Sequence, residues 1–312
     1  MGKTKQSLIF KRSFLRKLFP LFCALVLLTV YSVSRVQTGM ATDTLTTAAE
    51  TASENILAVH FLDVGQGDAI FVQLPDGQTM LIDSGDDDGG AILDYIKSLK
   101  CDEITYAVAT HPHLDHIGGM ADVLNGISVG KFYMPKISSS TRAFERMLTA
   151  LKEEGCGIIT AKAGVTILDT AVLKITIIAP VKNHYKDVNN YSAVIKLTYK
   201  NNTFLFTGDA GALSESQIIS DIDADVLKVG HHGSSDSSSD DFLLKVSPEY
   251  AVISCGKGNS YGHPHAETMQ KLKKSGAKIY RTDLSGTIVM TSNGKTINVN
   301  RKPESGQPGT PD

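Results

Sequence analysis

The stretch THPHLDHIGG, Thr110 to Gly119, holds three of the nine histidines in the chain and an aspartate. His111 and His113 are two residues apart at the end of an apolar segment, so a strand would direct both imidazoles to one side. Asp115 and His116 follow where the chain turns toward two glycines. Imidazole nitrogen and carboxylate oxygen suit Zn²⁺, or Mn²⁺ where oxygen dominates, and two facing pairs of ligands suit two ions. A solvated histidine-rich loop is the alternative, but H-x-H-x-D-H directly after an apolar strand is rare by chance.

Residue types that bind metals also stand at the ends of other predicted strands. Asp209 follows a strand in FLFTGDAG, and His231 and His232 follow one in LKVGHHGSS. Because the order of apolar strand, ligand type and glycine recurs, we expect all three motifs to converge on one edge of the sheets. A lone aspartate at a strand end is usually a helix cap, and the recurrence favours a metal site instead. Asp83 in LIDSG is a fourth strand-end carboxylate, which we interpret as a group that holds a ligand histidine or a helix start.

Two further motifs allow a functional or a structural interpretation. SYGHPH lies on a loop between a strand and a helix, from which His263, and with less support His265, can reach the metal pocket and contact phosphate oxygens or a leaving group. The alternative is a helix cap with solvated histidines. The acids of DVGQGDA, residues 63–69, precede every metal motif in the chain. They are interpreted as structural, with Asp68 as a candidate for the pocket wall.

The elements that position these residues alternate between strand and helix patterns. Residues 56–74 and 78–85 flank the turn signal PDG and predict a hairpin, and residues 191–209 predict two strands joined around NN. Residues 91–100 and 140–155 have helical periodicity, and the second stretch ends at a glycine. Runs of strands with helices between them predict a single layered α/β domain from about residue 56 to residue 300, with sheets faced by helices.

Residues 1–34 differ in composition from the rest of the chain. They contain six basic residues and no acid, and an apolar run from Leu18 to Val33 follows the basic residues. This order predicts a signal peptide or a single transmembrane signal anchor, and the clustered basic residues disfavour the alternative of a buried core helix. Because positive charge stays inside, the catalytic domain is expected outside the cytoplasm, tethered to the cell membrane, or secreted if the segment is cleaved.

Beyond that segment the chain is acidic. Of the 31 basic residues 25 remain, against 33 acidic ones, which gives a net charge of −8. This excludes a broadly cationic clamp for nucleic acid, so a polyanionic substrate would have to be held locally, by metal. Residues 35–55 are small and polar and predict a flexible stalk, and residues 301–312 are rich in proline and glycine and predict a disordered tail.

Taken in order, H-x-H-x-D-H, T-G-D and G-H-H-G-S resemble the metallo-β-lactamase fold superfamily. HFLDVGQGDAIFV (60–72), NNYSAVIKL (189–197) and GNSYGHPHAET (258–268) further resemble the soluble domain of ComEC-type DNA-uptake proteins and their free-standing relatives. The resemblance covers roughly residues 56–300 and implies a four-layer αββα sandwich with the site at the sheet edges. One apolar segment stands in place of a long channel region, so the resemblance implies a free-standing, tethered or secreted relative, for which a role in DNA uptake does not follow automatically.

The resemblance also implies up to two divalent ions per chain, Zn²⁺ or Mn²⁺, with the following ligands: His111 and His113 for the first metal, Asp115, His116 and His232 for the second, Asp209 as the bridge, and His231 as a lesser candidate. The superfamily supplies a third histidine to the first metal, and the matching position here falls at Asn189 or Asn190. This departure implies a weaker first site, a water ligand or a harder ion than zinc. His184, in the same interval, lies in a polar loop and is interpreted as exposed.

The resulting hypothesis is an exported metal-dependent hydrolase, namely a phosphodiesterase or nuclease that cleaves DNA by a metal-activated water, which Asp115 would orient. Its substrate would be DNA or a small phosphodiester, since the low positive charge disfavours tight binding of long duplexes. One alternative is a hydrolase of another ester, lactone or amide, which an apolar pocket would favour. Another is a surface-tethered binding module with a structural or impaired metal site, which would bind one metal without turnover.

Overall fold

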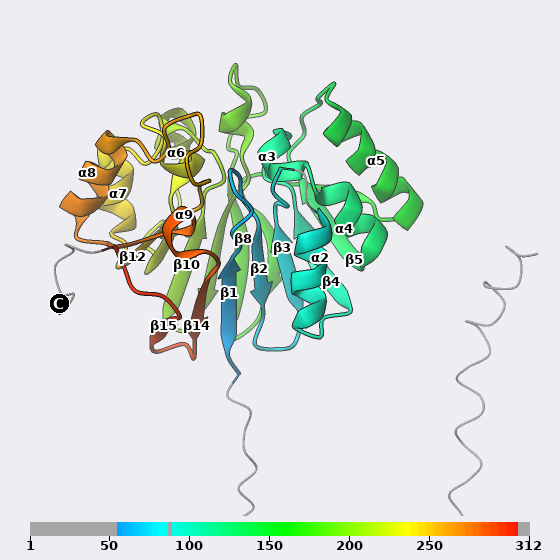
Figure 1. The fold of residues 1–312 in the computed structure, drawn as a ribbon, viewed down its shortest axis with the longest axis horizontal. Coiled ribbons are helices and arrows are strands. Elements are labelled where there is room, and N and C mark those ends of the chain that lie inside the picture. The colour runs from blue at the N-terminus through cyan, green and yellow to red at the C-terminus, as the bar shows by residue number, and fades with distance from the viewer. Residues whose placement is uncertain (1–54, 87–88, 305–312) are drawn as a thin grey trace, which may run out of the picture. The chain divides into compact units, whose positions relative to one another are not determined.

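The computed structural model describes residues 55–86 and 89–304, which lie within one compact unit, Thr51–Asp312. Two mixed β-sheets form its centre (Figure 1). The first sheet has the strand order β15-β14-β1-β2-β3-β4-β5-β6 and the second β13-β12-β11-β10-β9-β8-β7. The strands span β1 Leu57–Phe61, β2 Ile70–Gln73, β3 Thr79–Ile82, β4 Glu103–Val108, β5 Ser128–Met134, β6 Ile158–Thr160, β7 Val165–Asp169, β8 Leu173–Ala179, β9 Val194–Tyr199, β10 Asn202–Phe206, β11 Val226–Lys228, β12 Tyr250–Ile253, β13 Lys278–Arg281, β14 Ile288–Ser292 and β15 Ile297–Val299.

Helices cover the outer face of each sheet. Figure 1 shows α2, α4 and α5 on the side of the first sheet and α6, α7 and α8 on the side of the second. The helices are α2 Gly89–Ser98, α3 Leu114–Ile117, α4 Met120–Gly126, α5 Arg142–Glu154, α6 Ala212–Gln217, α7 Asp240–Val246, α8 Ala266–Ser275 and α9 Thr282–Ser285, with the 3₁₀ turns η1 Val188–Tyr191 and η2 Gly230–Gly233. The predicted four-layer αββα sandwich is confirmed.

Successive side chains of a strand in the first sheet point alternately into two hydrophobic cores, one on each side of the sheet. Val72 and Met80 point into the core between the sheets, whereas their neighbours Phe71 and Leu81 pack under the helices of the first sheet. Successive side chains of a strand face opposite sides, so a strand with helices on one side and a sheet on the other is apolar throughout. This explains why the sequence shows continuous apolar runs instead of strict alternation.

Helix α5 illustrates how local sequence sets the element boundaries. The Thr141 side chain accepts a hydrogen bond from the Phe144 amide, and Gly155 ends the helix in a left-handed conformation with φ of 76°. Phe144, Met147 and Leu151 recur at helical spacing and are buried against the first sheet. The predicted helix and its glycine stop are therefore confirmed.

The DVGQGDA segment divides residues 56–74 into two strands, β1 and β2, which pair antiparallel. Its loop lies against the H-x-H-x-D-H loop, because the Asp68 amide donates to the Asp115 carbonyl at 3.1 Å. Gly67 permits this approach, since a side chain there would collide with the same carbonyl oxygen. The segment is thus part of the scaffold around the site.

The strand ends bring the sequence motifs to one edge of the two sheets. Strands β3 and β4 run parallel, as do β10, β11 and β12, so their carboxyl ends share an edge. Asp83 follows β3 and His111 follows β4, while Asp209 follows β10 and His232 follows β11. This is the predicted convergence.

The predicted signal segment, residues 1–34, and the stalk up to residue 54 lie outside the described residues. Among the residues that the structure describes, no helix is long and apolar enough to cross a membrane. Of the predicted tail, residues 301–312, all but the first four residues lie outside the described residues. Its first four residues lie against the domain, where Arg301 Nε donates to the Thr287 carbonyl and the Glu304 amide to the Ile279 carbonyl.

Candidate metal centre

Four residues from three separate segments of the chain form the first ligand group: Asp115, His116, Asp209 and His232. His116 Nε2 lies 3.2 Å from Asp209 Oδ1 and 3.3 Å from His232 Nε2, and His232 Nε2 lies 3.2 Å from Asp115 Oδ2. One ligand atom from each of the four lies within 4.8 Å of the others. Two imidazoles and two carboxylates at this spacing suit a divalent ion such as Zn²⁺.

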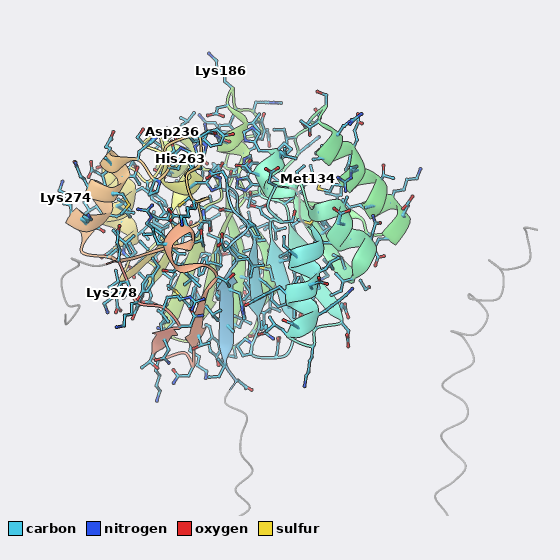
Figure 2. All side chains as sticks on the ribbon, in the orientation of Figure 1. Met134, Lys186, Asp236, His263, Lys274 and Lys278 are labelled. Atoms are coloured by element: carbon cyan, nitrogen blue, oxygen red, sulfur yellow. The ribbon has the colours of Figure 1, made fainter. Side chains whose placement is uncertain are left out.

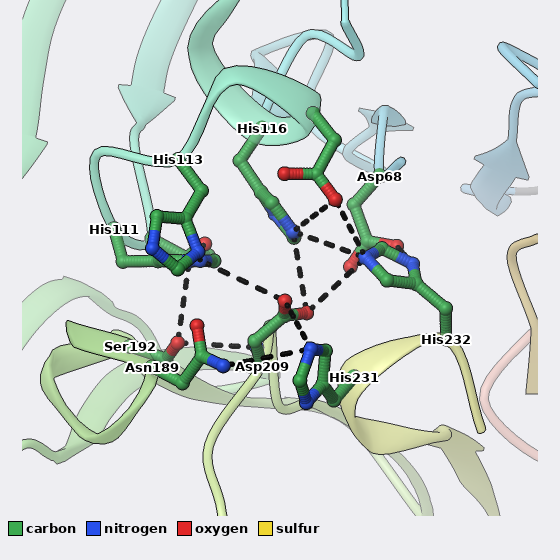
Figure 3. Close-up of polar contacts among 12 residues, drawn as sticks. Asp68, His111, His113, His116, Asn189, Ser192, Asp209, His231 and His232 are labelled. Atoms are coloured by element: carbon green, nitrogen blue, oxygen red, sulfur yellow. Dashed lines mark hydrogen bonds and ion pairs between the residues drawn. The ribbon is translucent and has the colours of Figure 1, made fainter. Parts of the chain in front are cut away.

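The second ligand group shares Asp209 with the first. It consists of His111, His113 and Asp209, with 3.0 Å between His111 Nε2 and His113 Nδ1 and 3.7 Å between His111 Nε2 and Asp209 Oδ2. Figure 3 shows the Asp209 carboxylate between the two groups. Its Oδ1 is buried and faces the Nε2 atoms of His116 and His232, at 3.2 and 3.5 Å, which are themselves candidate ligand atoms. The residues of both groups therefore fit divalent metal binding, and Asp209 belongs to each group.

Each buried ligand histidine is held at its Nδ1 atom, which leaves Nε2 directed at the centre. The Nδ1 atom of His116 contacts Asp83 Oδ2 at 2.7 Å, and that of His232 contacts the Ser254 carbonyl at 3.0 Å. Such outer partners fix the ring orientation of a metal ligand. His232 adopts a left-handed conformation with φ of 54°, which is rare outside glycine and indicates a site held by its surroundings.

The charges of the centre are arranged for a cation. Burial alone would raise the pKa of Asp209, but the charges of His116 and His232 outweigh it and hold this pKa well below its usual value. Burial alone would lower the pKa of His116, but Asp209 and Asp83 outweigh it and hold this pKa well above its usual value. Asp209 is therefore ionised at neutral pH, and a bound metal would take the place of the imidazole protons.

Comparison with known proteins decides the family. Residues 62–257 match the profile described as the metallo-beta-lactamase superfamily. The chain belongs to this superfamily. It is 31% identical over 251 residues to ComE operon protein 3 of Bacillus subtilis, covering 74% of this chain and 32% of that protein. It is 28% identical over 239 residues to Recombination protein 2 of Haemophilus influenzae, covering 74% of this chain and 28% of that protein. The chain thus spans about a third or less of the length of these relatives.

Solved structures support the fold alone. The diiron beta-hydroxylase CmlA of Streptomyces venezuelae aligns with a TM-score of 0.50 and 13% identity, over 76% of this chain and 54% of that one. At this identity the likeness extends to the arrangement of sheets and helices. The family match and the relatives above identify a metallo-beta-lactamase domain of the ComEC type, and its fold and ligand groups are those of a metal-dependent hydrolase.

The structure distinguishes between the two asparagines at the position where the superfamily places a histidine. Asn189 faces the centre, with its Nδ2 atom 3.5 Å from His231 Nε2 and its Oδ1 atom buried without a hydrogen-bond partner among residues 55–86 and 89–304. Asn190 points away and accepts a hydrogen bond from the Ser214 amide at the start of α6. His184 is exposed, as predicted, and lines a separate cleft. Asn189 is therefore the candidate ligand of the first metal.

The remaining histidine candidates differ in how close they lie to the metal centre. His231 lies 3.5 Å from Asp209 Oδ2 and 3.1 Å from Asp236, at the rim of the centre. His263 lines the cleft above it, and Figure 2 shows His263 and Asp236 on the same side of the molecule. Burial and the neighbouring histidines lower the pKa of His263 to about 4, so its imidazole is neutral at neutral pH. His265 does not line this cleft, because Ser235 and the Tyr261 carbonyl hold its ring.

A buried ion pair beside the centre was not predicted. Lys228 is fully buried and its Nζ atom lies 2.8 Å from Asp68 Oδ2, while Asp68 Oδ1 lies 3.4 Å from His232 Nδ1. Against the effect of burial, Lys228 lowers the pKa of Asp68 to about 2. Asp68 thus contacts the candidate ligand His232 at its Nδ1 atom, on the side of the ring away from the metal centre. The available sequence signal was the lysine inside the apolar strand VLKV, because a buried lysine requires a partner.

Replacing Asp83 by asparagine should weaken metal binding by about 10- to 100-fold, because His116 loses the carboxylate that orients its ring and raises its basicity. Asp83 has φ of 58°, which asparagine also tolerates, so the fold should persist. Competition with a chelator measures the loss, and the exposed Asp102→Asn serves as the matched control. Equal metal retention in the two variants would show that Asp83 plays no part in holding the ligand.

Proposed function

We propose that this chain is an exported metal-dependent phosphodiesterase that cleaves DNA, with single strands and small phosphodiesters as its substrates. The observation that carries the proposal is the position of Asp209, whose carboxylate faces both ligand groups beneath an open cleft. Paired divalent ions supply Lewis acidity for an in-line displacement at phosphorus and lower the pKa of a water. The basic and apolar segments predicted at residues 1–34 support a position outside the cytoplasm.

The cleft favours a phosphodiester over an apolar ester. It has a volume of about 340 Å³, and imidazoles and carboxylates form most of its wall together with Gln66, Leu114 and Tyr261. The described lining contains no lysine or arginine. A phosphate oxygen would therefore rely on the metals and on imidazole N–H groups. The polar wall also disfavours the alternative of a hydrolase that selects an apolar acyl group.

Asp115 and His263 would have different roles in hydrolysis. The Asp115 side chain is 28% exposed in the cleft and is ionised, because hydrogen bonding to His232 and the charge of His116 outweigh burial and hold its pKa low. It can accept a hydrogen bond from the attacking water and fix its orientation. His263 lines the cleft and is neutral, so one ring nitrogen carries a proton and can donate a hydrogen bond to a phosphate oxygen.

The test is hydrolysis by metal-reconstituted protein of single-stranded DNA, linear duplex DNA and bis(4-nitrophenyl) phosphate. We expect turnover of the model diester and of single strands, with elemental analysis giving one to two divalent ions per chain. Protein that binds two ions and cleaves none of the three substrates would refute the phosphodiesterase and favour the ester, lactone or amide hydrolase. One bound ion without any turnover would favour the binding module.

A further inference from the structure

A second cleft, of about 410 Å³, lies at the same edge of the sheets as the metal centre. Lys136 follows β5, Lys162 follows β6, and Lys182 follows β8, and all three line it together with His184 and Tyr191. The three lysines are exposed. Figure 2 shows Lys186, from the same loop as Lys182 and His184, projecting from the edge that also carries His263. Three neighbouring strand ends thus place cations around one hollow.

The turn η1 separates this cleft from the metal centre. Tyr191 lines the cleft, whereas Asn189, two residues earlier, faces His231 in the centre. Ser192, the next residue, has its hydroxyl 3.4 Å from His111 Nδ1. A ligand in the second cleft therefore lies one short turn of chain away from the proposed scissile bond.

Among residues 55–86 and 89–304, no acidic side chain pairs with the lysines of the cleft. None of the three forms an ion pair within the described residues, and no acid is among the residues that line the cleft. Six other described lysines form ion pairs, such as Lys174 with Asp169 and Lys278 with Glu249, so what distinguishes the cleft is the gathering of three unpaired lysines around one hollow. Uncompensated cations around one hollow, in a chain that is acidic beyond its first 34 residues, indicate a local anion site.

We propose that this lysine cleft, defined by Lys136, Lys162 and Lys182, binds the sugar-phosphate backbone of single-stranded nucleic acid next to the metal centre. The inference rests on the proposed function and names its substrate more closely. The cleft supplies the cations that the metal centre lacks, so the centre holds the reacting phosphate and the cleft holds its neighbours in the strand.

The aromatic residue of the cleft favours a single strand over a duplex. Tyr191 is partly exposed, and its hydroxyl accepts a hydrogen bond from the Tyr185 amide, which fixes the ring. Sites for single strands combine a basic groove along the backbone with aromatic rings on which unpaired bases stack. In a duplex the bases are stacked on one another and cannot reach such a ring.

The test compares two triple variants of the full chain. The cleft variant carries Lys136→Gln, Lys162→Gln and Lys182→Gln. The matched control carries Lys97→Gln, Lys100→Gln and Lys295→Gln, three exposed lysines, of which Lys97 and Lys100 precede the start of β4 and Lys295 follows β14, away from the carboxyl ends that carry the metal centre. Fluorescence anisotropy with a labelled single-stranded oligodeoxynucleotide in the presence of a chelator reports binding without cleavage. Anisotropy with a labelled duplex and flotation with phosphatidylglycerol vesicles accompany it.

We expect the cleft variant to bind the single strand at least about tenfold more weakly, with the slope of log K against log salt reduced by about 2, since each lost phosphate contact removes about 0.7. The control should bind like the wild type, and both variants should hydrolyse bis(4-nitrophenyl) phosphate at the wild-type rate. Wild-type affinity in the cleft variant overturns the inference. A loss confined to duplex, or to vesicles, overturns it in favour of that ligand.

The binding assay also separates this inference from the proposed function. If the cleft variant loses single-strand binding while the wild type cleaves no phosphodiester under any metal, the lysine cleft stands and the phosphodiesterase is refuted. If the wild type cleaves single strands and the cleft variant binds and cleaves them equally well, the phosphodiesterase stands and the lysine cleft is refuted.

Discussion

Asp209→Asn should lower kcat/KM for a phosphodiester by about a thousandfold. The change removes the carboxylate that both ligand groups share and leaves an amide of nearly the same shape. Stabilisation of transition-state charge by bound metal contributes several kcal/mol, and each 1.4 kcal/mol is about tenfold in rate. The number of ions retained per chain, measured by elemental analysis after gel filtration, should fall in parallel.

The control for this prediction is Asp223→Asn, the same chemical change at an exposed position. It should retain both wild-type activity and wild-type metal content. Circular dichroism should show that Asp209→Asn remains folded, because asparagine fills the same volume at the strand end. A folded Asp209→Asn protein with wild-type kcat/KM and two bound ions would exclude Asp209 as the bridge.

The positions of the candidate ligands could be predicted because residue types that bind metals stand directly after the strands in the sequence. His111, Asp209 and His232 each follow an apolar run, and parallel strands carry the residues at their carboxyl ends to a common edge. The same reasoning gave Asp83 two possible roles, as a partner of a ligand histidine or of a helix start, and in the structure it contacts His116. The pattern of strand, ligand and glycine can be seen in a short stretch of sequence. Once the strands are known to run parallel, the pattern predicts which residues lie close together.

Other parts of the site depend on contacts that no local pattern contains. The sequence left Asn189 and Asn190 equivalent, and only the fold of η1 turns one toward His231 and the other toward α6. The lysine cleft joins residues from three separate strand ends, none of which belongs to a motif. The pairing of Lys228 with Asp68 likewise joins positions 160 residues apart in the chain. Such contacts are properties of the packed sheets.

The departure at Asn189 predicts an unusual metal requirement. An amide oxygen is a harder ligand than imidazole, and Mn²⁺ prefers oxygen, although the affinity order still favours zinc at equilibrium. The wild-type enzyme should therefore be stimulated by added Mn²⁺ more than by trace Zn²⁺, and the zinc at the His111 and His113 site should be lost readily to a chelator. Activity titrations with each metal, together with chelator competition, measure both effects.

Asn189→His should reverse this behaviour, tightening zinc retention at that site by at least about tenfold and removing most of the manganese requirement, because the loss of even an outer partner of a ligand costs 10- to 100-fold in metal affinity. Asn190→His is the matched control. Its position supports the Ser214 amide at the start of α6, so histidine there should lower thermal stability without tightening zinc. If wild-type enzyme is fully active with two equivalents of zinc and gains nothing from manganese, a water and not Asn189 completes the first site, since His184 lies in the lysine cleft on the far side of η1.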